Sequence, residues 1–221
     1  MSNSVTYSKM RVKKMVFLAL FTALAYASTL IIHPKVLFLT FDIKDAVITL
    51  AAMAFGPLSG VIISGLVAFI EFISISDTGL YGLIMNFLSS ATFSFTASLI
   101  YKHKKTLFGG IIGLFAAAFV TTATMILANI LVTPYFMKTT TEEVIMLIPK
   151  LLFPFNALKS IANAGLVIAF YKPVSNALKA VGALKRKEED RLVFDKITVI
   201  LLLCALALSA FAIVVMFTVM A

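Results

Sequence analysis

The sequence predicts an all-α integral membrane protein, with a six-helix membrane bundle and one additional C-terminal transmembrane helix. Of its 221 residues, 61% are hydrophobic and only 13% are charged, and the mean hydropathy is +1.05. Soluble proteins average about 45–50% apolar and about 25% charged residues. The apolar residues form long runs, and spans of about 20 residues leave room for roughly six or seven helices and little for a soluble domain.

Gly, Pro and charged residues divide the chain into seven apolar runs. Basic residues precede the first run, and the turn Gly56-Pro57 separates a short second run from the third. A basic turn follows the fourth run, and a longer amphiphilic segment with prolines separates the fifth from the sixth. The seventh run has no interior charge and has the pattern of a plain anchor. The predicted helices are 14–32, 46–55, 58–73, 83–101, 107–131, 155–171 and 193–220.

The basic residues indicate the orientation in the membrane. Most of the 19 Lys and Arg residues lie at the N-terminus, in the turn 102–105 or within 172–196. The positive-inside rule places these segments and the N-terminus in the cytoplasm. Because they flank helices, the net charge of +9 does not indicate nucleic-acid binding. The opposite face carries loops 33–45, 74–82 and 133–154, so a site built from these loops would open to the outside.

The first run also allows a second interpretation. Its basic start, apolar stretch and Ala25-Tyr26-Ala27 before Ser28 are compatible with a cleaved signal sequence. Alternatively, Ala19, Ala23 and Ala27 line one face of a retained helix, where small residues let another helix approach closely. The single cysteine of the chain excludes an intrachain disulfide and a cysteine metal cluster, and we expect no metal site.

Polar side chains interrupt several apolar runs. The bilayer core has no water to solvate them, so such residues are usually kept for function. Asn156, Lys159 and Asn163 are spaced i, i+3 and i+7 and therefore share one helix face. Lys159 could instead snorkel to the interface, and Glu71 could simply pair with it.

Asn86 and Asn129 lie in the fourth and fifth runs and could bond neighbouring helices. All these polar groups lie at the predicted outward ends of helices, beside loops with aromatic residues. Apolar and aromatic walls can bury a flat ring, and an amide both donates and accepts hydrogen bonds at its edge. The pattern favours a flat aromatic ligand. The aromatic loop residues are Phe38, Phe41, Tyr81, Tyr135 and Phe153.

Residues 14–173 contain six strings in a recognisable order and spacing, namely FLTFDIKDAVI, FGPLSG, FIEFISISDTGLYGLIMNFLSSATF, IYKHKKT, ANILVTPYFM and LLFPFNALKSIANAGL. They carry a resemblance to the riboflavin-specific substrate-binding (S) components of energy-coupling factor (ECF) transporters. It implies six helices in a bacterial cell membrane, a cytoplasmic N-terminus, and an outward cavity that the first loop closes. It also favours a retained first helix over a cleaved signal sequence.

The resemblance implies ligand contacts at Asn129 in ANILVTP and at Asn156 and Lys159 in FNALK. It places first-loop residues around the cavity, namely Leu39, Phe41 and Asp42. Further positions follow from the shared strings alone, namely Glu71, Tyr81, Asn86 and Asn163. The alanine face Ala19, Ala23 and Ala27 resembles the surface on which the transmembrane coupling subunit docks.

The sequence departs from the family pattern in two places. The usual aromatic before the helix-five asparagine is Ala128, and the usual glycines after the helix-six lysine are Ser160 and Ile161, which could change the width of the pocket. The binding domain is predicted at 1–180, a basic and acidic cytoplasmic linker at 181–192, and the additional helix at 193–221.

The resemblance implies that this subunit captures riboflavin as a transported ligand, with no cofactor, and delivers it inward. Its implied partners are a transmembrane coupling subunit and two ATPase subunits, because the sequence has no G-x-x-x-x-G-K-[ST] phosphate loop. Three alternatives remain: an S component for another vitamin, an ion-coupled secondary transporter that uses a Glu71–Lys159 pair, and an intramembrane hydrolase. The sequence contains no HExxH motif or acid dyad, so we expect no enzyme.

Overall fold

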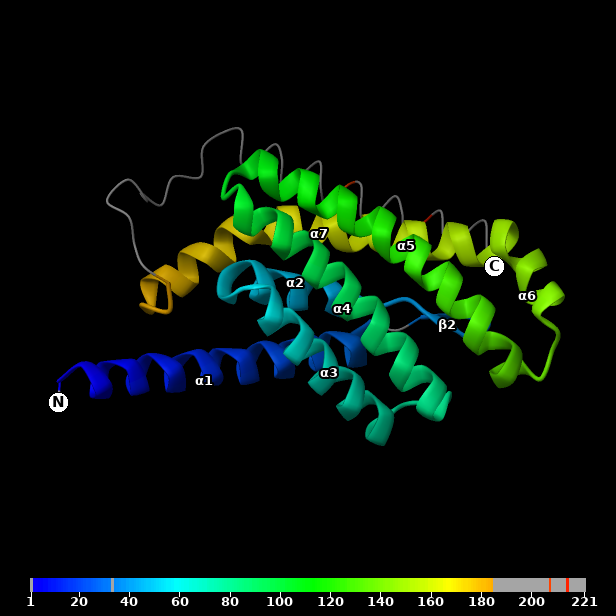
Figure 1. Cartoon of the computed structure of the whole chain (residues 1–221), viewed down its shortest axis with the longest axis horizontal. Helices are drawn as coiled ribbons and strands as arrows, with labels where there is room; N and C mark the ends of the chain where they lie inside the picture. The colour runs from blue at the N-terminus through cyan, green and yellow to red at the C-terminus, as the bar shows by residue number, and fades with distance from the viewer. Residues whose placement is uncertain (1, 33, 185–206, 208–213, 215–221) are drawn as a thin grey trace.

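The computed structural model describes residues 2–32, 34–184, 207 and 214 (Figure 1). It is a bundle of helices with one small hairpin. Most of the predicted linker 181–192 and of the seventh run 193–220 lies outside the described residues. The elements are α1 (Ser2–Ile31), β1 (Lys35–Val36), β2 (Leu39–Thr40), α2 (Lys44–Phe55), α3 (Pro57–Ser74), α4 (Gly79–His103), α5 (Leu107–Met137), α6 (Thr141–Leu147), the π-helical turn η1 (Ile148–Leu152) and α7 (Phe153–Ala180).

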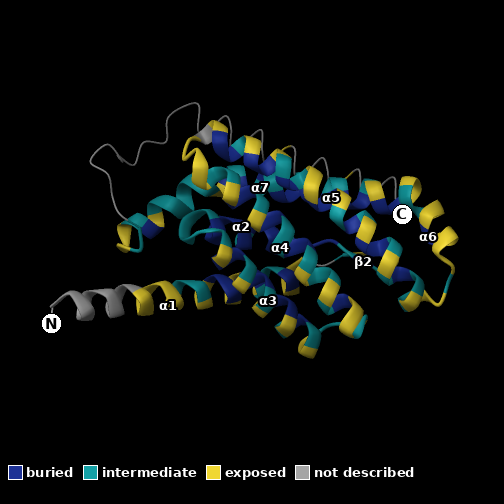
Figure 2. Cartoon of the chain, viewed as in Figure 1, coloured by how far each residue is buried: buried dark blue, intermediate teal, exposed yellow. Residues whose placement is uncertain are grey.

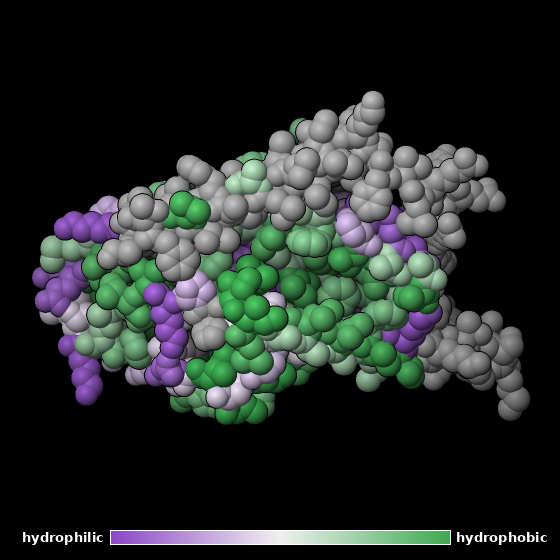
Figure 3. Space-filling model, turned by 180° about the vertical axis from the view of Figure 1, so that it is seen from behind, coloured by the Kyte–Doolittle hydropathy of each residue, from purple (hydrophilic) through white to green (hydrophobic). Residues whose placement is uncertain are grey.

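Five helices of the described chain are long and apolar enough to cross a membrane, namely Arg11–Ile31, Pro57–Ser74, Gly79–His103, Phe108–Met137 and Thr141–Ala180. The face drawn in Figure 3 has apolar residues across its middle and hydrophilic residues gathered toward its two ends. That distribution suits a bilayer, whose hydrocarbon core lies between two polar interfaces. The prediction of an all-helical membrane fold is confirmed.

Helix α2 differs from the others because it lies inside the bundle. Its 12 residues extend about 18 Å at 1.5 Å per residue, less than the bilayer core of about 30 Å. Eight of them are buried, and the helix packs against α1, α3, α4 and α7. Small side chains such as Ala51 and Ala52, both fully buried, allow this close packing. Figure 2 shows the buried residues concentrated where the helices face one another.

The segment 133–154, predicted as a loop, is largely helical. Helix α5 continues through Pro134 to Met137, and it ends at Lys138 in a left-handed conformation with φ of 53°. Thr140 then begins α6 by accepting a hydrogen bond from the Glu143 N–H. The prolines that indicated a loop are tolerated inside or at the starts of these helices, so this segment is more ordered than the sequence predicted.

A two-stranded antiparallel hairpin closes the end of the bundle opposite the N-terminus. It pairs Lys35 with Thr40 and Val36 with Leu39, and Leu37 at its tip has φ of 55°. Its inner side joins a hydrophobic cluster with η1 and α7 that includes Leu39, Leu152 and Phe155. The hairpin thereby forms a cover over the helix ends.

The opposite end of the bundle is held by lysines of α1. Lys13 Nζ donates to the carbonyl oxygens of Val181 and Gly182, both at 2.8 Å, just after the end of α7. Lys14 Nζ donates to the Phe55 carbonyl at 3.1 Å, where α2 ends. These bonds give partners to carbonyl groups at the end of α2 and just after the end of α7.

Gly60 lies where α3 packs closely against α2 and α4. A Cβ atom added there would lie 2.7 Å from the Ala52 Cβ and 2.8 Å from the Ser94 Oγ. We predict that Gly60→Ala lowers the thermal unfolding temperature in detergent, since overpacking typically costs about 1–3 kcal/mol. Gly65→Ala is the matched control, because its new Cβ would meet only Phe87 at 3.7 Å. Equal unfolding temperatures for the two variants would contradict the close packing.

Candidate functional site

A cavity of about 100 Å³ lies under the hairpin, at the end of the bundle opposite the N-terminus. Its walls come from the hairpin and from α4, α5 and α7. The aromatic rings of Phe38 and Tyr81 lie near Phe136, with ring centroids 6.3 and 6.0 Å away. We call this space the first cavity. Of the predicted site residues, it is lined by Leu39, Tyr81, Asn86, Asn129, Asn156 and Lys159.

Asn129 and Asn156 reach this cavity with their amides already oriented. Asn129 Nδ2 donates to the Met125 carbonyl at 2.7 Å, and its Oδ1 accepts from Thr133 Oγ1 at 2.9 Å. Asn156 Nδ2 donates to the Leu152 carbonyl at 2.7 Å. An amide has two N–H donors and two acceptor lone pairs, so both side chains retain bonding capacity. Fixed amides beside aromatic walls can orient the polar edge of a planar ligand.

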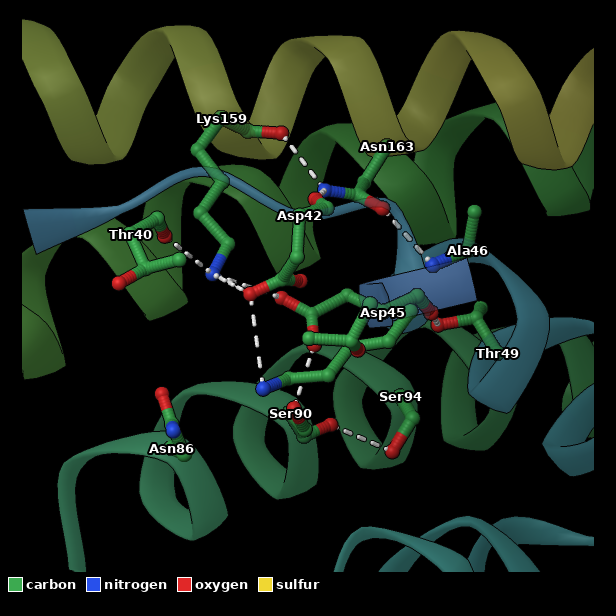
Figure 4. A network of polar contacts seen from close by, with 12 residues as sticks. Thr40, Asp42, Asp45, Ala46, Thr49, Asn86, Ser90, Ser94, Lys159 and Asn163 are labelled. Atoms are coloured by element: carbon green, nitrogen blue, oxygen red, sulfur yellow. Dashed lines mark hydrogen bonds and ion pairs between the residues drawn. The ribbon is translucent and has the colours of Figure 1, made fainter. Parts of the chain in front are cut away.

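Lys159 ties α7 to the end of the hairpin. Its Nζ lies 2.9 Å from Asp42 Oδ2, 3.9 Å from Asp45 Oδ2 and 3.4 Å from the Thr40 carbonyl. Figure 4 shows Lys159 and Asn163 projecting from one helix toward Asp42 and Ala46. Lys159 is 7% exposed and therefore does not snorkel. Its position at the cavity wall makes the ammonium group available to a ligand as well as to Asp42.

A second buried ion pair corrects the suggested pairing of Glu71 with Lys159. Glu71 receives hydrogen bonds from Lys44 Nζ at 2.6 and 2.8 Å. Thr29 Oγ1 also donates to it at 3.0 Å, and Asn86 Nδ2 at 3.1 Å. Sequence reasoning missed Lys44 because it begins α2 directly after a polar loop and was assigned to that loop. The signal that could have indicated burial of Lys44 is the charged pair Lys44-Asp45 directly before the short apolar run 46–55.

Asp42 joins the two ion pairs, since Lys44 Nζ also lies 3.5 Å from Asp42 Oδ2. Burial raises the pKa of the Asp42 carboxyl, but the Lys159 and Lys44 ammonium groups outweigh this effect and hold the pKa below its ordinary value. Asp42 is therefore ionised and can only accept hydrogen bonds. We call Asp42, Lys44, Asp45, Glu71 and Lys159 the buried charge network.

Phe41 and Asn163 are predicted site residues that do not line the first cavity. Phe41 is 1% exposed and packs in the cluster under the hairpin. Asn163 is fully buried, its Oδ1 accepts from the Ala46 N–H at 2.9 Å, and its Nδ2 donates to the Asp42 carbonyl at 3.1 Å. The N-cap residue Ile43 has no capping side chain, so Asn163 provides this bond from α7. Both residues support the shape of the first loop.

The predicted docking alanines lie on α1. Ala19, Ala23 and Ala27 are all exposed, and the neighbouring Leu20 and Leu24 are each 50% exposed. Within the described chain they form a face of small and apolar side chains on the outside of the bundle. Such a face can accept a partner helix at short distance.

The buried charge network predicts a particular response to substitution. Lys44→Met leaves Glu71 without its cation, and breaking a buried ion pair costs about 3–5 kcal/mol. We expect a strong fall in thermal stability. The double variant Lys44→Met/Glu71→Leu removes both charges and should recover much of the loss. Thermal unfolding of both proteins in detergent measures this, and a double variant less stable than Lys44→Met would contradict the assigned pair.

Comparison with known proteins places the chain in a family. Residues 13–171 match the family described as "ECF transporter, substrate-specific component". The chain is 29% identical over 179 residues to the riboflavin transporter RibU of Staphylococcus aureus (strain TCH60), covering 76% of this chain and 94% of that protein. A solved structure titled "Structure and mechanism of the S component of a bacterial ECF transporter" has a TM-score of 0.66 and 28% identity, covering 76% of this chain and 99% of that one. The protein is a multi-pass membrane protein and belongs to the substrate-specific components of ECF transporters.

Proposed function

We propose that the protein binds riboflavin in the first cavity and passes it into the cell. The observation that carries this proposal is the pair of fixed amides, Asn129 and Asn156, in one cavity with the rings of Phe38, Tyr81 and Phe136. The tricyclic flavin ring has a flat apolar body and an imide edge that needs both donors and acceptors. The name of the S. aureus relative supports the same ligand.

The proposed route begins outside the cell, with the N-terminus in the cytoplasm. The hairpin would then be the lid of the site. It is held at two points, by the Lys159–Asp42 pair inside and by an ion pair between Lys35 and Asp77 near the surface. Because Lys159 also borders the cavity, a ligand that bonds its ammonium group would favour the closed position of the hairpin. Binding of the ligand would thus help to hold the hairpin over the cavity.

Release requires partners in this proposal. The partners are a transmembrane coupling subunit and two ATPases, since the sequence has no phosphate loop of its own. The exposed alanine face of α1 is the proposed contact with the coupling subunit. A partner that binds only the released conformation shifts the protein away from the ligand-bound one. In this scheme the subunit is a binding protein and not a catalyst.

Two alternatives remain less supported. The first is an S component for another vitamin. It is suggested by Ala128, which stands where the family pattern has an aromatic residue, and by Ser160 and Ile161, which stand where it has glycines, because these differences could change the width of the pocket. The ion-coupled transporter required Glu71 beside Lys159, whereas Glu71 bonds Lys44. No contact among the described residues therefore favours it.

Ligand binding tests the first part of the proposal. We expect the purified protein to quench riboflavin fluorescence saturably at micromolar ligand. Asn129→Ala should weaken binding by about 1–3 kcal/mol, because ligand groups lose a buried partner. Leu131 lies on the same helix and is 69% exposed, so the control variant Leu131→Ala should bind riboflavin normally. Absence of saturable quenching by the unchanged protein would refute riboflavin as the ligand.

Subunit assembly tests the second part. Ala23→Trp places a large ring on the exposed alanine face and should abolish co-purification with the coupling subunit and its ATPases. Riboflavin titration should be unchanged, because Ala23 lies outside the first cavity. The control Leu131→Trp adds a ring of the same size at an exposed position of α5 instead of α1. Normal co-purification of Ala23→Trp would refute this docking surface.

A further inference from the structure

Helix α1 carries the proposed docking face but none of the residues that line the first cavity. It lies at the edge of the bundle and packs against α2 and α3 (Figure 1). A partner on the outer face of α1 is thus separated from the cavity by the helix itself. Its effect on a bound ligand has to pass through side chains that join α1 to the bundle, or along the chain that leads from α1 into the hairpin.

Two side-chain hydrogen bonds join α1 to α3. Tyr26 Oη donates to Ser74 Oγ at 2.8 Å near the surface, and Thr29 Oγ1 donates to Glu71 Oε1 at 3.0 Å in the interior. Thr29 is 3% exposed, whereas the docking alanines of the same helix are exposed, so it lies on the inward face of α1. The bond to Glu71 therefore links the docking helix directly to the buried charge network.

Glu71 is connected to the first cavity in two directions. Asn86 Nδ2 donates to Glu71 at 3.1 Å, and Asn86 lines the cavity. Lys44 Nζ donates to Glu71 at 2.6 Å and lies 3.5 Å from Asp42 Oδ2. The same Asp42 oxygen lies 2.9 Å from Lys159 Nζ, and Lys159 also lines the cavity. A change in the bonding of Glu71 thus alters the positions of groups that a ligand would contact.

The Thr29 hydroxyl has two alternative acceptors. Its Oγ1 lies 3.0 Å from Glu71 Oε1 and 3.2 Å from the Ala25 carbonyl oxygen of its own helix. A hydroxyl has one proton to donate, so a full bond to one acceptor excludes a full bond to the other. Threonines in helices commonly bond the carbonyl four residues earlier. The hydroxyl can therefore leave Glu71 and remain paired, while Glu71 loses a donor. Two discrete arrangements of this kind are what coupling between sites requires.

We propose that Thr29 carries the effect of docking on α1 to the ligand site. In the free subunit the hydroxyl bonds Glu71, and the buried charge network holds the cavity walls in the arrangement that binds the ligand. A partner that displaces α1 turns the hydroxyl to the Ala25 carbonyl, and the loss of a donor at Glu71 lowers the affinity for the ligand. This inference rests on the proposed riboflavin function and docking surface, and it adds the connection between them. Thr29 is a positioning residue, since it lies outside the first cavity.

Four variants on α1 test the inference. Thr29→Val nearly keeps the shape of the side chain and removes the hydroxyl, Thr29→Ala removes it with a smaller side chain, and Thr29→Ser retains it. Thr22→Val is the matched control, because Thr22 is 6% exposed and its hydroxyl donates at 2.8 Å to the Leu18 carbonyl of its own helix. Riboflavin fluorescence is titrated with the full-length protein in detergent, alone and assembled with the coupling subunit and ATPases. Thermal unfolding checks the folding of each variant.

We expect the unchanged protein to bind riboflavin more tightly alone than when assembled. Thr29→Val and Thr29→Ala should weaken binding by the free subunit about threefold to tenfold, as expected for a lost hydrogen bond. They should leave the affinity of the assembled subunit within about twofold, because the bond is already absent there. Thr29→Ser and Thr22→Val should retain both affinities. By linkage, riboflavin should oppose the assembly of Thr29→Val less than that of the unchanged protein.

Three results would overturn the role of Thr29 and leave riboflavin as the ligand. They are equal weakening of the free and assembled forms by the folded Thr29 variants, free-subunit affinities that these variants do not change, and a Thr22→Val variant that behaves as Thr29→Val does. Equal affinities of the unchanged protein alone and assembled would overturn both this inference and the proposed release. Failure of the unchanged free protein to bind riboflavin would overturn the proposed function together with the inference.

Discussion

The buried charge network is the constraint on which the rest of the structure depends. Asp42 follows the hairpin, Lys44 begins α2, Glu71 lies on α3, and Lys159 lies on α7. Removing such charges from water is costly, and the cost is offset only when each group has partners at good geometry. The network therefore fixes the relative positions of the hairpin and three helices. One of its members, Lys159, borders the first cavity.

Much of the fold could be predicted from the sequence because lipid imposes a simple rule. Spans must be long, apolar and helical, and α3, α4, α5 and α7 contain the predicted runs 58–73, 83–101, 107–131 and 155–171. The hairpin and α6 were not predicted. A two-residue strand has too few residues to establish an alternating pattern, and Pro134 indicated a break that α5 does not make.

The candidate site was predictable in part for the same reason. Polar residues within spans stand out, and Asn129, Asn156 and Lys159 do border one cavity. Lys44 and Asp45 did not stand out, because charges at the junction of a loop and a short helix are usually solvated. Their burial depends on α2 lying inside the bundle, which is a tertiary arrangement. The Asn163 bond to the Ala46 N–H spans 117 residues and has no local signal.

The position of α2 has an electrostatic consequence for this network. Three carboxyl groups meet two ammonium groups there, and Asp45 lies in the first turn of α2, where burial raises the pKa of its carboxyl group. The aligned peptide dipoles of a helix give its N-terminus a partial positive charge, which stabilises nearby anions. A helix that begins within the protein carries this potential to a depth that mobile counterions do not reach. The backbone itself thus supplies part of the positive charge that the side chains lack, and bulk salt should have little influence on that balance.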